Sequence, residues 1–190
     1  MSEVHRNRAA RIVLLNGPGS AGKSSIARAL QSITAEPFIH VPMDAFLDML
    51  SDAWQDRADG IAYENLGDDD TPEVAVRVGP VGERLIRGMR KAVVALAGEG
   101  NDLILDDVLL DDNRQDYIDA LTAFDLFVVG VFAPLETLEE RERARGDRLP
   151  GLARWQVERV HKGMNYDLRL DTSQMSAEEC ARRIKQKFRL

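Results

Sequence analysis

Residues 12–24 read IVLLNGPGSAGKS, four apolar residues followed by a glycine-rich turn that ends on a lysine and a serine. The run Ile12 to Leu15 is typical of a strand buried on both faces of a parallel sheet. The eight residues from Gly17 match the pattern G-x-x-x-x-G-K-[ST] at every fixed position, and a helix-period segment opens at Lys23. Strand, glycine-rich turn and helix in this order predict a phosphate-binding loop, because glycines let backbone N–H groups surround an anion and the helix N-terminus adds donors.

This loop predicts a nucleotide site. Lys23 is placed to reach the β- and γ-phosphates of ATP, and the Ser24 hydroxyl to help hold Mg²⁺. The alternative is a glycine-rich turn that carries a lysine by chance. We therefore expect ATP contacts from Gly17, Pro18, Gly19, Ser20, Ala21, Gly22, Lys23, Ser24 and Ser25.

Short apolar runs alternate with helix-period segments along the rest of the chain. Four further strands are expected at residues 38–41, 103–105, 126–131 and 166–170. Helices are expected at 23–33, 45–50, 82–97, 112–121, 135–145, 154–162 and 176–188. Together with the phosphate-binding loop, this alternation predicts an α/β, three-layer P-loop NTPase fold, with a parallel sheet flanked by helices in one domain over residues 1–190.

Composition restricts the function further. The 190 residues carry a formal charge of −7 and contain one cysteine, Cys180, which excludes an intramolecular disulfide and a cysteine-based zinc site. The negative charge disfavours broad binding to nucleic acid or to anionic membranes. The charged N-terminus has no apolar stretch behind it, and no apolar run approaches a membrane span, so we expect a cytoplasmic protein.

One segment interrupts the alternation. Residues 52–73 hold eight acidic residues against one basic residue, Arg57. A loop this long inside a compact domain is usually functional or disordered. We interpret residues 52–79 as an insertion near the acceptor site and expect its acidic tract at 68–70 to face water.

Two acidic positions follow predicted strands. Asp106 and Asp107 end the strand at 103–105, where a carboxylate can orient Mg²⁺; of the two we favour Asp106 as the metal-side residue. Asp44 follows the strand at 38–41 and directly precedes a helical segment. It is either a helix N-cap or a general base at the carboxyl end of a strand, and we favour the base.

Arginines gather at residues 141–148. Arg141 and Arg145 are four residues apart and share a helix face, while Arg143 and Arg148 complete the cluster. Such a segment, at about residues 139–150, can close over the phosphates as a lid. The alternative is a solvated helix in which these arginines pair with Glu139, Glu140 and Glu142 (the cluster's acidic neighbours).

The chain resembles the chloramphenicol phosphotransferase-like family of P-loop small-molecule kinases over most of its length. The matching segments are residues 12–17, 20–24 and 30–32, Asp44, Gly79-Pro80, 104–110, 144–148, 160–163, Tyr166-Asp167 and Asp171-Thr172. The resemblance implies a five-stranded parallel sheet and a nucleotide-kinase-like fold that uses ATP with Mg²⁺. It also implies Asp44 as catalytic base, Arg145 and Arg148 in the lid, and Asp171 and Thr172 near the nucleotide base.

The expected function is transfer of the γ-phosphate of ATP to a hydroxyl of a small molecule, with a chloramphenicol-like antibiotic as one possible acceptor. We expect Asp44, Lys23, Arg145 and Arg148 to be catalytic, Arg141 to contact ATP, and Ser24 and Asp106 to hold the metal. His161 is expected to be a packed residue. Two alternatives stay open: a toxin-like kinase of a nucleotide sugar, and a non-catalytic ATP-sensing module that binds a protein.

Overall fold

The computed structural model describes residues 8–68, 70–110, 114–146 and 149–190. A five-stranded sheet with the order β2-β5-β1-β6-β7 runs through it, and every neighbouring pair of strands is parallel. The central strand β1 (Arg11–Asn16) lies between β5 (Asp102–Asp107) and β6 (Asp125–Phe132). The edges are β2 (Phe38–Pro42) and β7 (Leu168–Asp171). The α/β fold with a five-stranded parallel sheet is therefore confirmed.

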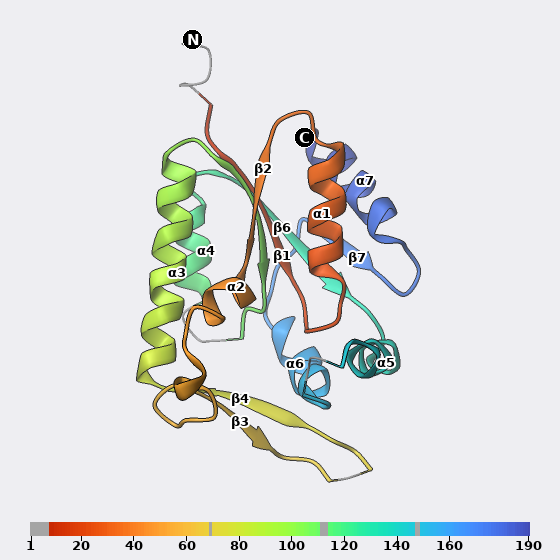
Figure 1. Ribbon diagram of the computed structural model, residues 1–190. Coiled ribbons are helices and arrows are strands. Elements are labelled where there is room, and N and C mark those ends of the chain that lie inside the picture. Colours follow the sequence, from red (N-terminus) through yellow and green to blue (C-terminus); the bar gives the residue numbers. More distant parts are fainter. Residues whose placement is uncertain (1–7, 69, 111–113, 147–148) are drawn as a thin grey trace.

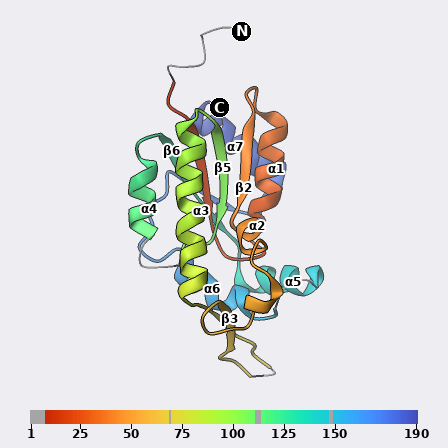
Figure 2. The ribbon, with the colours of Figure 1, turned by 60° about the vertical axis from the view of Figure 1, so that its left-hand side comes forward.

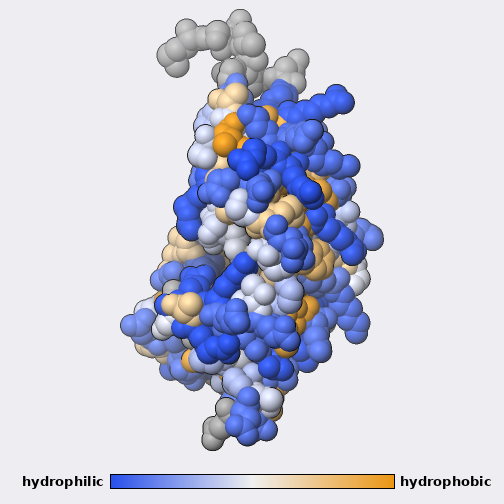
Figure 3. All heavy atoms as spheres, turned by 90° about the vertical axis from the view of Figure 1, so that its right-hand side faces the viewer, coloured by the Kyte–Doolittle hydropathy of each residue, from blue (hydrophilic) through white to orange (hydrophobic). Residues whose placement is uncertain are grey.

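Helices cover both faces of this sheet, which gives three layers (Figure 1). Val13 and Leu15 of β1 pack on one face, beneath α1 (Lys23–Ile33) and α7 (Ala177–Phe188). Ile12 and Leu14 pack on the other face, beneath α3 (Pro80–Gly98) and α4 (Arg114–Leu121). Successive residues of a strand point to opposite faces, so a strand covered on both sides is apolar throughout. The outer face over α1, α5 and α7 is largely hydrophilic (Figure 3).

Three shorter helices lie at the carboxyl end of the strands. They are α2 (Met43–Leu47), α5 (Leu135–Arg145) and α6 (Leu152–Val160). α5 ends where predicted, at Gly146, which adopts a left-handed φ of 69°. α2 and α6 each begin two residues earlier than predicted, because Pro42 and Gly151 precede their first turns.

Much of the acidic segment has regular secondary structure, which the sequence did not predict. It forms a short 3₁₀ turn (Asp52–Trp54) and an antiparallel hairpin of β3 (Ile61–Asn65) and β4 (Val74–Val78). The hairpin forms its own two-stranded sheet and projects beyond the carboxyl end of the main sheet (Figures 1 and 2). Within the described ranges, no helix combines the length and apolar character needed to cross a membrane.

Candidate active site

A cavity of about 580 Å³ lies at the carboxyl end of the parallel strands, between the phosphate-binding loop and the hairpin. In open α/β folds this edge is where ligands bind, because strand-to-helix loops converge there. The charged side chains that line it are Lys23, Arg28, Asp44, Arg90, Asp106, Asp107 and Arg145. The structure therefore gathers at one place most of the residues that the sequence predicted for catalysis.

The glycine-rich loop has the geometry of an anion cradle. Gly22, the N-cap of α1, has a left-handed φ of 89° and no side chain to accept from the first-turn N–H groups. Ser20 also has a positive φ, 60°, and its buried hydroxyl has no hydrogen-bond partner among the described residues. The Lys23 ammonium donates to the carbonyls of Gly17 and Pro18, each at 3.0 Å. Backbone donors, an unmatched hydroxyl and a cation thus line a site that suits a polyphosphate.

Asp106 faces this loop. Its Oδ2 accepts from the Ser24 hydroxyl at 2.5 Å, and its Oδ1 lies 3.7 Å from the Lys23 ammonium. Burial alone would raise the pKa of Asp106, but hydrogen bonding from His40, the Lys23 charge and the Ser24 hydroxyl outweigh it and lower the pKa. The carboxyl group therefore remains a charged oxygen ligand.

This arrangement fits a magnesium ion. Mg²⁺ usually binds one or two carboxylates together with substrate phosphates and waters, so a dense protein cage is not needed. In the part of the chain that the structure describes, no group of three or more acidic, histidine or cysteine side chains could hold a metal ion by itself. The pair of Ser24 and Asp106 supplies a hydroxyl and a charged carboxylate beside the loop, which is a suitable set for an ion shared with phosphates.

Asp107 occupies a different environment from its neighbour. It is 4% exposed, and its Oδ1 accepts from the backbone N–H of Val108 at 2.7 Å. Burial raises the pKa of Asp107 to about 6, although the positive charges of Arg90 and Lys23 oppose the shift. Arg90 lies over the ring of Tyr117, 5.0 Å from its centroid. Asp107 and Arg90 thus line the same cavity as the apolar side chains of the hairpin.

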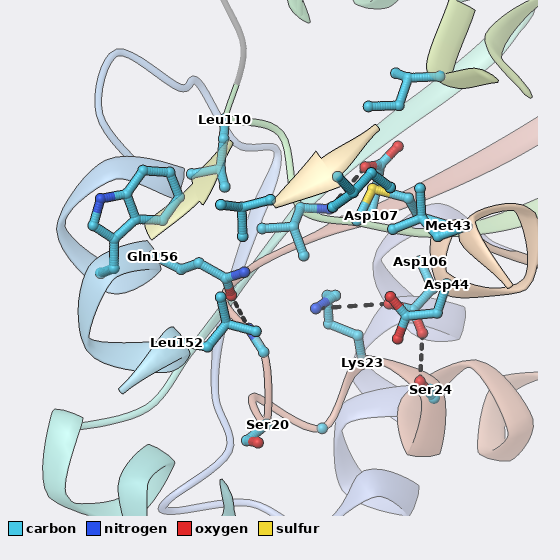
Figure 4. Close-up of a pocket in the computed structure, with 18 of the residues that line it drawn as sticks. Ser20, Lys23, Ser24, Met43, Asp44, Asp106, Asp107, Leu110, Leu152 and Gln156 are labelled. Carbon is cyan, nitrogen blue, oxygen red and sulfur yellow. Dashed lines mark hydrogen bonds and ion pairs between the residues drawn. The ribbon is translucent and has the colours of Figure 1, made fainter. Parts of the chain in front are cut away.

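Asp44 belongs to the first turn of α2, and its side chain lines the cavity. The helix N-cap is Pro42, so the interpretation of Asp44 as the N-cap is wrong. The side chain is partly exposed, which leaves it accessible from the cavity. Figure 4 shows Asp44 beside Asp106, on the far side of Lys23 from α6.

The arginine cluster divides into residues with different surroundings. Arg141 donates to the hydroxyl and the carbonyl of Thr172, at 2.9 and 2.8 Å, and approaches the carbonyl of Ser20 at 3.5 Å. Arg145 lines the cavity, and Arg143 is exposed. Arg148 lies outside the described residues.

The acidic neighbours of the arginines are not simply solvated. Glu142 is 3% exposed and accepts from the backbone N–H groups of Gly151 and Ala153, at 2.8 and 2.9 Å. Glu139 pairs with Arg154 of α6 at 2.5 Å. These contacts connect α5 to the first turn of α6, so the alternative of a solvated helix is wrong for Glu139 and Glu142.

The end of the last strand, β7, contacts the phosphate-binding loop through Thr172. The Thr172 hydroxyl donates to the Ala21 carbonyl at 3.0 Å, and Asp171 accepts from the backbone N–H and the hydroxyl of Ser173, at 2.9 and 2.6 Å. Their contact with a nucleotide base stays a prediction. His161 is packed, as expected: it stacks on Phe132 with ring centroids 3.8 Å apart, and burial lowers its pKa to about 4.

The hairpin presents an apolar face to the cavity. Ile61 pairs with Val78 across the hairpin and Tyr63 with Val76, and all four line the cavity. Glu64 lies on the other face, where it pairs with Arg77 at 2.6 Å. Asp68 and Asp70 are exposed, as expected for the acidic tract, and among the described acidic residues of the segment none lines this cavity.

Sequence reasoning missed three features of α6 and its surroundings. Trp155 and Gln156 line the cavity, and Gln156 accepts from the backbone N–H of Gly19 at 2.6 Å. The network of Asn16, His161 and Tyr166 joins the end of β1 to the end of α6. No motif spacing relates α6 to the phosphate-binding loop, since 137 residues separate Gly19 from Gln156. The pattern of a helix alone therefore could not have shown this contact.

The fold and the loop define a P-loop kinase architecture, and solved structures with this architecture resemble the chain. The APS kinase of Mycobacterium tuberculosis, solved with AMPPNP and APS, has a TM-score of 0.63 at 18% identity, covering 96% of this chain and 99% of that one. A gluconokinase from Sinorhizobium meliloti has a TM-score of 0.58 at 19% identity, covering 97% and 94%. At these identities the likeness concerns the fold alone.

Sequence comparison identifies the family. Residues 10–189 match the model of a family described as "Chloramphenicol phosphotransferase-like protein". A Mycobacterium tuberculosis protein named "Putative O-phosphotransferase" is 32% identical over 186 residues, which cover 94% of this chain and 82% of the relative. The chain belongs to the chloramphenicol phosphotransferase-like family and is a phosphotransferase of the P-loop kinase type.

Proposed function

We propose that this protein transfers the γ-phosphate of ATP to a hydroxyl group of a small molecule, with a chloramphenicol-like antibiotic among the candidate acceptors. The observation that carries the proposal is the shared cavity: Asp44 and Lys23 line it together with the hydrogen-bonded pair of Ser24 and Asp106. A carboxylate suited to accept a proton from a hydroxyl and a loop suited to a polyphosphate thus line one cavity.

In this proposal the donor side holds the nucleotide. Backbone N–H groups of the loop and the Lys23 ammonium bind the β- and γ-phosphates, while Ser24 and Asp106 hold Mg²⁺. The metal ion neutralises charge on the phosphate oxygens. Arg145, which lines the cavity, and Arg148 are assigned the role of adding positive charge over the transferring group. Arg141 contacts both Thr172 and the Ser20 carbonyl and thereby supports the loop that holds the nucleotide.

The acceptor side positions the hydroxyl. Asp44 accepts the proton of the acceptor hydroxyl as its oxygen forms a bond to the γ-phosphorus, and the bond between that phosphorus and the bridging oxygen breaks to release ADP. The proton of the acceptor hydroxyl stays on Asp44 until solvent removes it. Excluding water favours transfer to the acceptor over hydrolysis.

The shape and chemistry of the cavity suggest the type of acceptor. Tyr63, Val76 and Val78 of the hairpin line the cavity together with Leu47, Leu152 and Trp155. An acceptor with an apolar body and a hydroxyl that reaches Asp44 would bury surface on this wall. Such a wall does not favour a highly charged sugar phosphate.

The test is an assay of ADP release over a panel of hydroxylated compounds, including amphenicols, aminoglycosides, sugars and nucleosides. We expect an acceptor with an apolar body to stimulate ADP formation and to appear as a phosphate monoester by mass spectrometry. ATP binding without stimulation by any acceptor would contradict the proposal and favour the ATP-sensing alternative.

Asp44→Asn separates catalysis from nucleotide binding. The amide cannot take the proton, so we expect turnover to fall by about 10²- to 10⁴-fold, while ATP affinity stays within a factor of about three. Asp56→Asn, at an exposed position outside the cavity, is the matched control and should keep full activity. A parallel loss of turnover and ATP affinity in Asp44→Asn would assign Asp44 a structural role.

A further inference from the structure

Gln156 of α6 contacts the phosphate-binding loop directly. Its side-chain oxygen accepts from the backbone N–H of Gly19 at 2.6 Å, and the residue is 6% exposed. Because a backbone N–H can only donate, the amide oxygen of Gln156 must face the loop, and the amide nitrogen must point the other way. The orientation of this amide is therefore fixed by chemistry.

The amide nitrogen points into the cavity. Gln156 lines the cavity, and its nitrogen has no hydrogen-bond partner among the described residues. The nitrogen is not one of the buried polar atoms that lack a hydrogen-bond partner, so it is accessible from the cavity. Figure 4 shows it on the cavity side of α6, with Lys23 between it and Asp106. Two N–H donors are thus directed to the space beside the loop.

The position of α6 is held at both ends. At its N-terminus, Glu142 accepts from the N–H groups of Gly151 and Ala153. At its C-terminus, the side chain of Asn16 donates to the carbonyl of Val160 at 3.0 Å. A side chain on a helix fixed in this way loses little further freedom on binding, which makes it an effective preorganised donor.

Gln156 also lies at the junction between the two parts of the cavity. Its neighbour Trp155 lines the apolar part, whereas its own contact, Gly19, belongs to the glycine-rich loop. A phosphoryl group that moves from nucleotide to acceptor must cross this junction. Negative charge develops on the equatorial oxygens of the phosphoryl group during transfer, and a fixed N–H donor stabilises that charge.

We propose that the side-chain NH₂ group of Gln156 donates a hydrogen bond to an oxygen of the γ-phosphoryl group, and that Gln156 is a catalytic residue of the transfer. The inference rests on the proposed use of ATP. The bond is present when ATP is bound and strengthens as charge moves to the γ-phosphoryl oxygens; it has no counterpart with ADP.

Gln156→Glu is the decisive variant. Glutamate has the same length and still accepts from Gly19, but it has lost both donors and gained a negative charge. We expect affinity for the non-hydrolysable analogue AMPPNP to fall by about tenfold or more, while ADP affinity changes by less than about threefold. With an acceptor present, we expect turnover to fall by about 10²-fold. Isothermal titration measures both affinities without any acceptor.

Two further variants keep the test decisive. Gln156→Met has a similar length and neither donor nor charge. Its affinity for AMPPNP should therefore also fall relative to its affinity for ADP, but by less than in Gln156→Glu. Gln115→Glu places the same change on the exposed face of α4 and should change neither affinity.

Equal losses of AMPPNP and ADP affinity in Gln156→Glu would overturn the inference, because they would show that Gln156 only shapes the loop. Unchanged affinities together with unchanged turnover would also overturn it. Neither result would affect the proposed function, which fails only if the wild-type protein binds no ATP or transfers no phosphate.

Discussion

The two walls of the cavity differ in chemistry: one is polar and charged, and the other is mainly apolar. On the donor side, backbone N–H groups, a lysine and a buried carboxylate are fixed by hydrogen bonds, as between Ser24 and Asp106 at 2.5 Å. On the proposed acceptor side, a hairpin outside the main sheet contributes apolar side chains such as Tyr63 and Val76. The donor wall can therefore recognise one chemical group with little tolerance, whereas the acceptor wall recognises shape and apolar surface.

Removing the cation of the donor wall should give the largest effect. We expect Lys23→Met to lower turnover by about 10³-fold or more, because the phosphates lose their closest fixed positive charge in a low-dielectric site. Lys187→Met on the exposed face of α7 is the control. The comparison of the two walls would fail if Lys23→Met kept most of its activity with a good acceptor.

The connection between the walls should be sensitive to Glu142. Glu142→Ala leaves the N–H groups of Gly151 and Ala153 buried without their acceptor, and we expect a loss of about 2–4 kcal/mol in the free energy of unfolding. Glu142→Gln keeps one acceptor oxygen and should lose less. Urea denaturation followed by circular dichroism measures both, and equal losses would contradict this account.

A change confined to the acceptor wall should alter the acceptor and leave the nucleotide unaffected. We expect Tyr63→Ala to raise the KM for the acceptor by about 10- to 100-fold through lost apolar contact, with ATP affinity unchanged. Arg77→Ala, on the opposite face of the hairpin, is the matched control. A fall in ATP affinity in Tyr63→Ala would show that the walls are not independent.

A pH-dependent effect is expected at Asp107, which lines the same cavity. The folded protein holds the pKa of Asp107 at about 6, above its ordinary value of 3.8, so the fold favours the neutral acid. The neutral carboxyl group makes its full contribution to the free energy of unfolding below pH 3.8, the pKa of an unfolded aspartate. That contribution is lost as the pH rises through about 6.

Asp107→Asn stays neutral at every pH and can still accept from Val108. We expect the variant to match the wild type near pH 4 and to become more stable as the pH rises, by up to about 3 kcal/mol at pH 8. Asp116→Asn on exposed α4 should show no such trend. Thermal unfolding at several pH values measures the difference, and a constant difference would contradict the raised pKa.

The difference between the walls also explains what the sequence could predict. The donor wall is local: Gly17 to Ser24 are contiguous, and Asp106 ends an apolar strand, so motif and periodicity predicted its geometry. The side chains of the acceptor wall come from elements that meet only in the fold. Val74, Val76 and Val78 alternate along the chain, but so short a strand is defined only by its pairing with β3, and the surrounding acidic residues obscured it.

Gln156 and Glu142 show a second limit. Each acts through one backbone contact to a distant segment, and neither residue type is unusual on a helix surface. Glu142 has the same sequence environment as the exposed Arg143, yet it is buried because its face of α5 meets α6. Only tertiary packing distinguishes the two.

The separate pairing of the hairpin has a consequence for how such proteins diversify. Residues 61–78 share no backbone ladder with the five strands among the described residues, so their sequence can change without altering the register of the core. An exchange of this segment between relatives would move an acceptor preference from one protein to another as a unit. If the hairpin selects the acceptor as proposed, changes within it can alter that selection while the phosphate-binding loop stays the same.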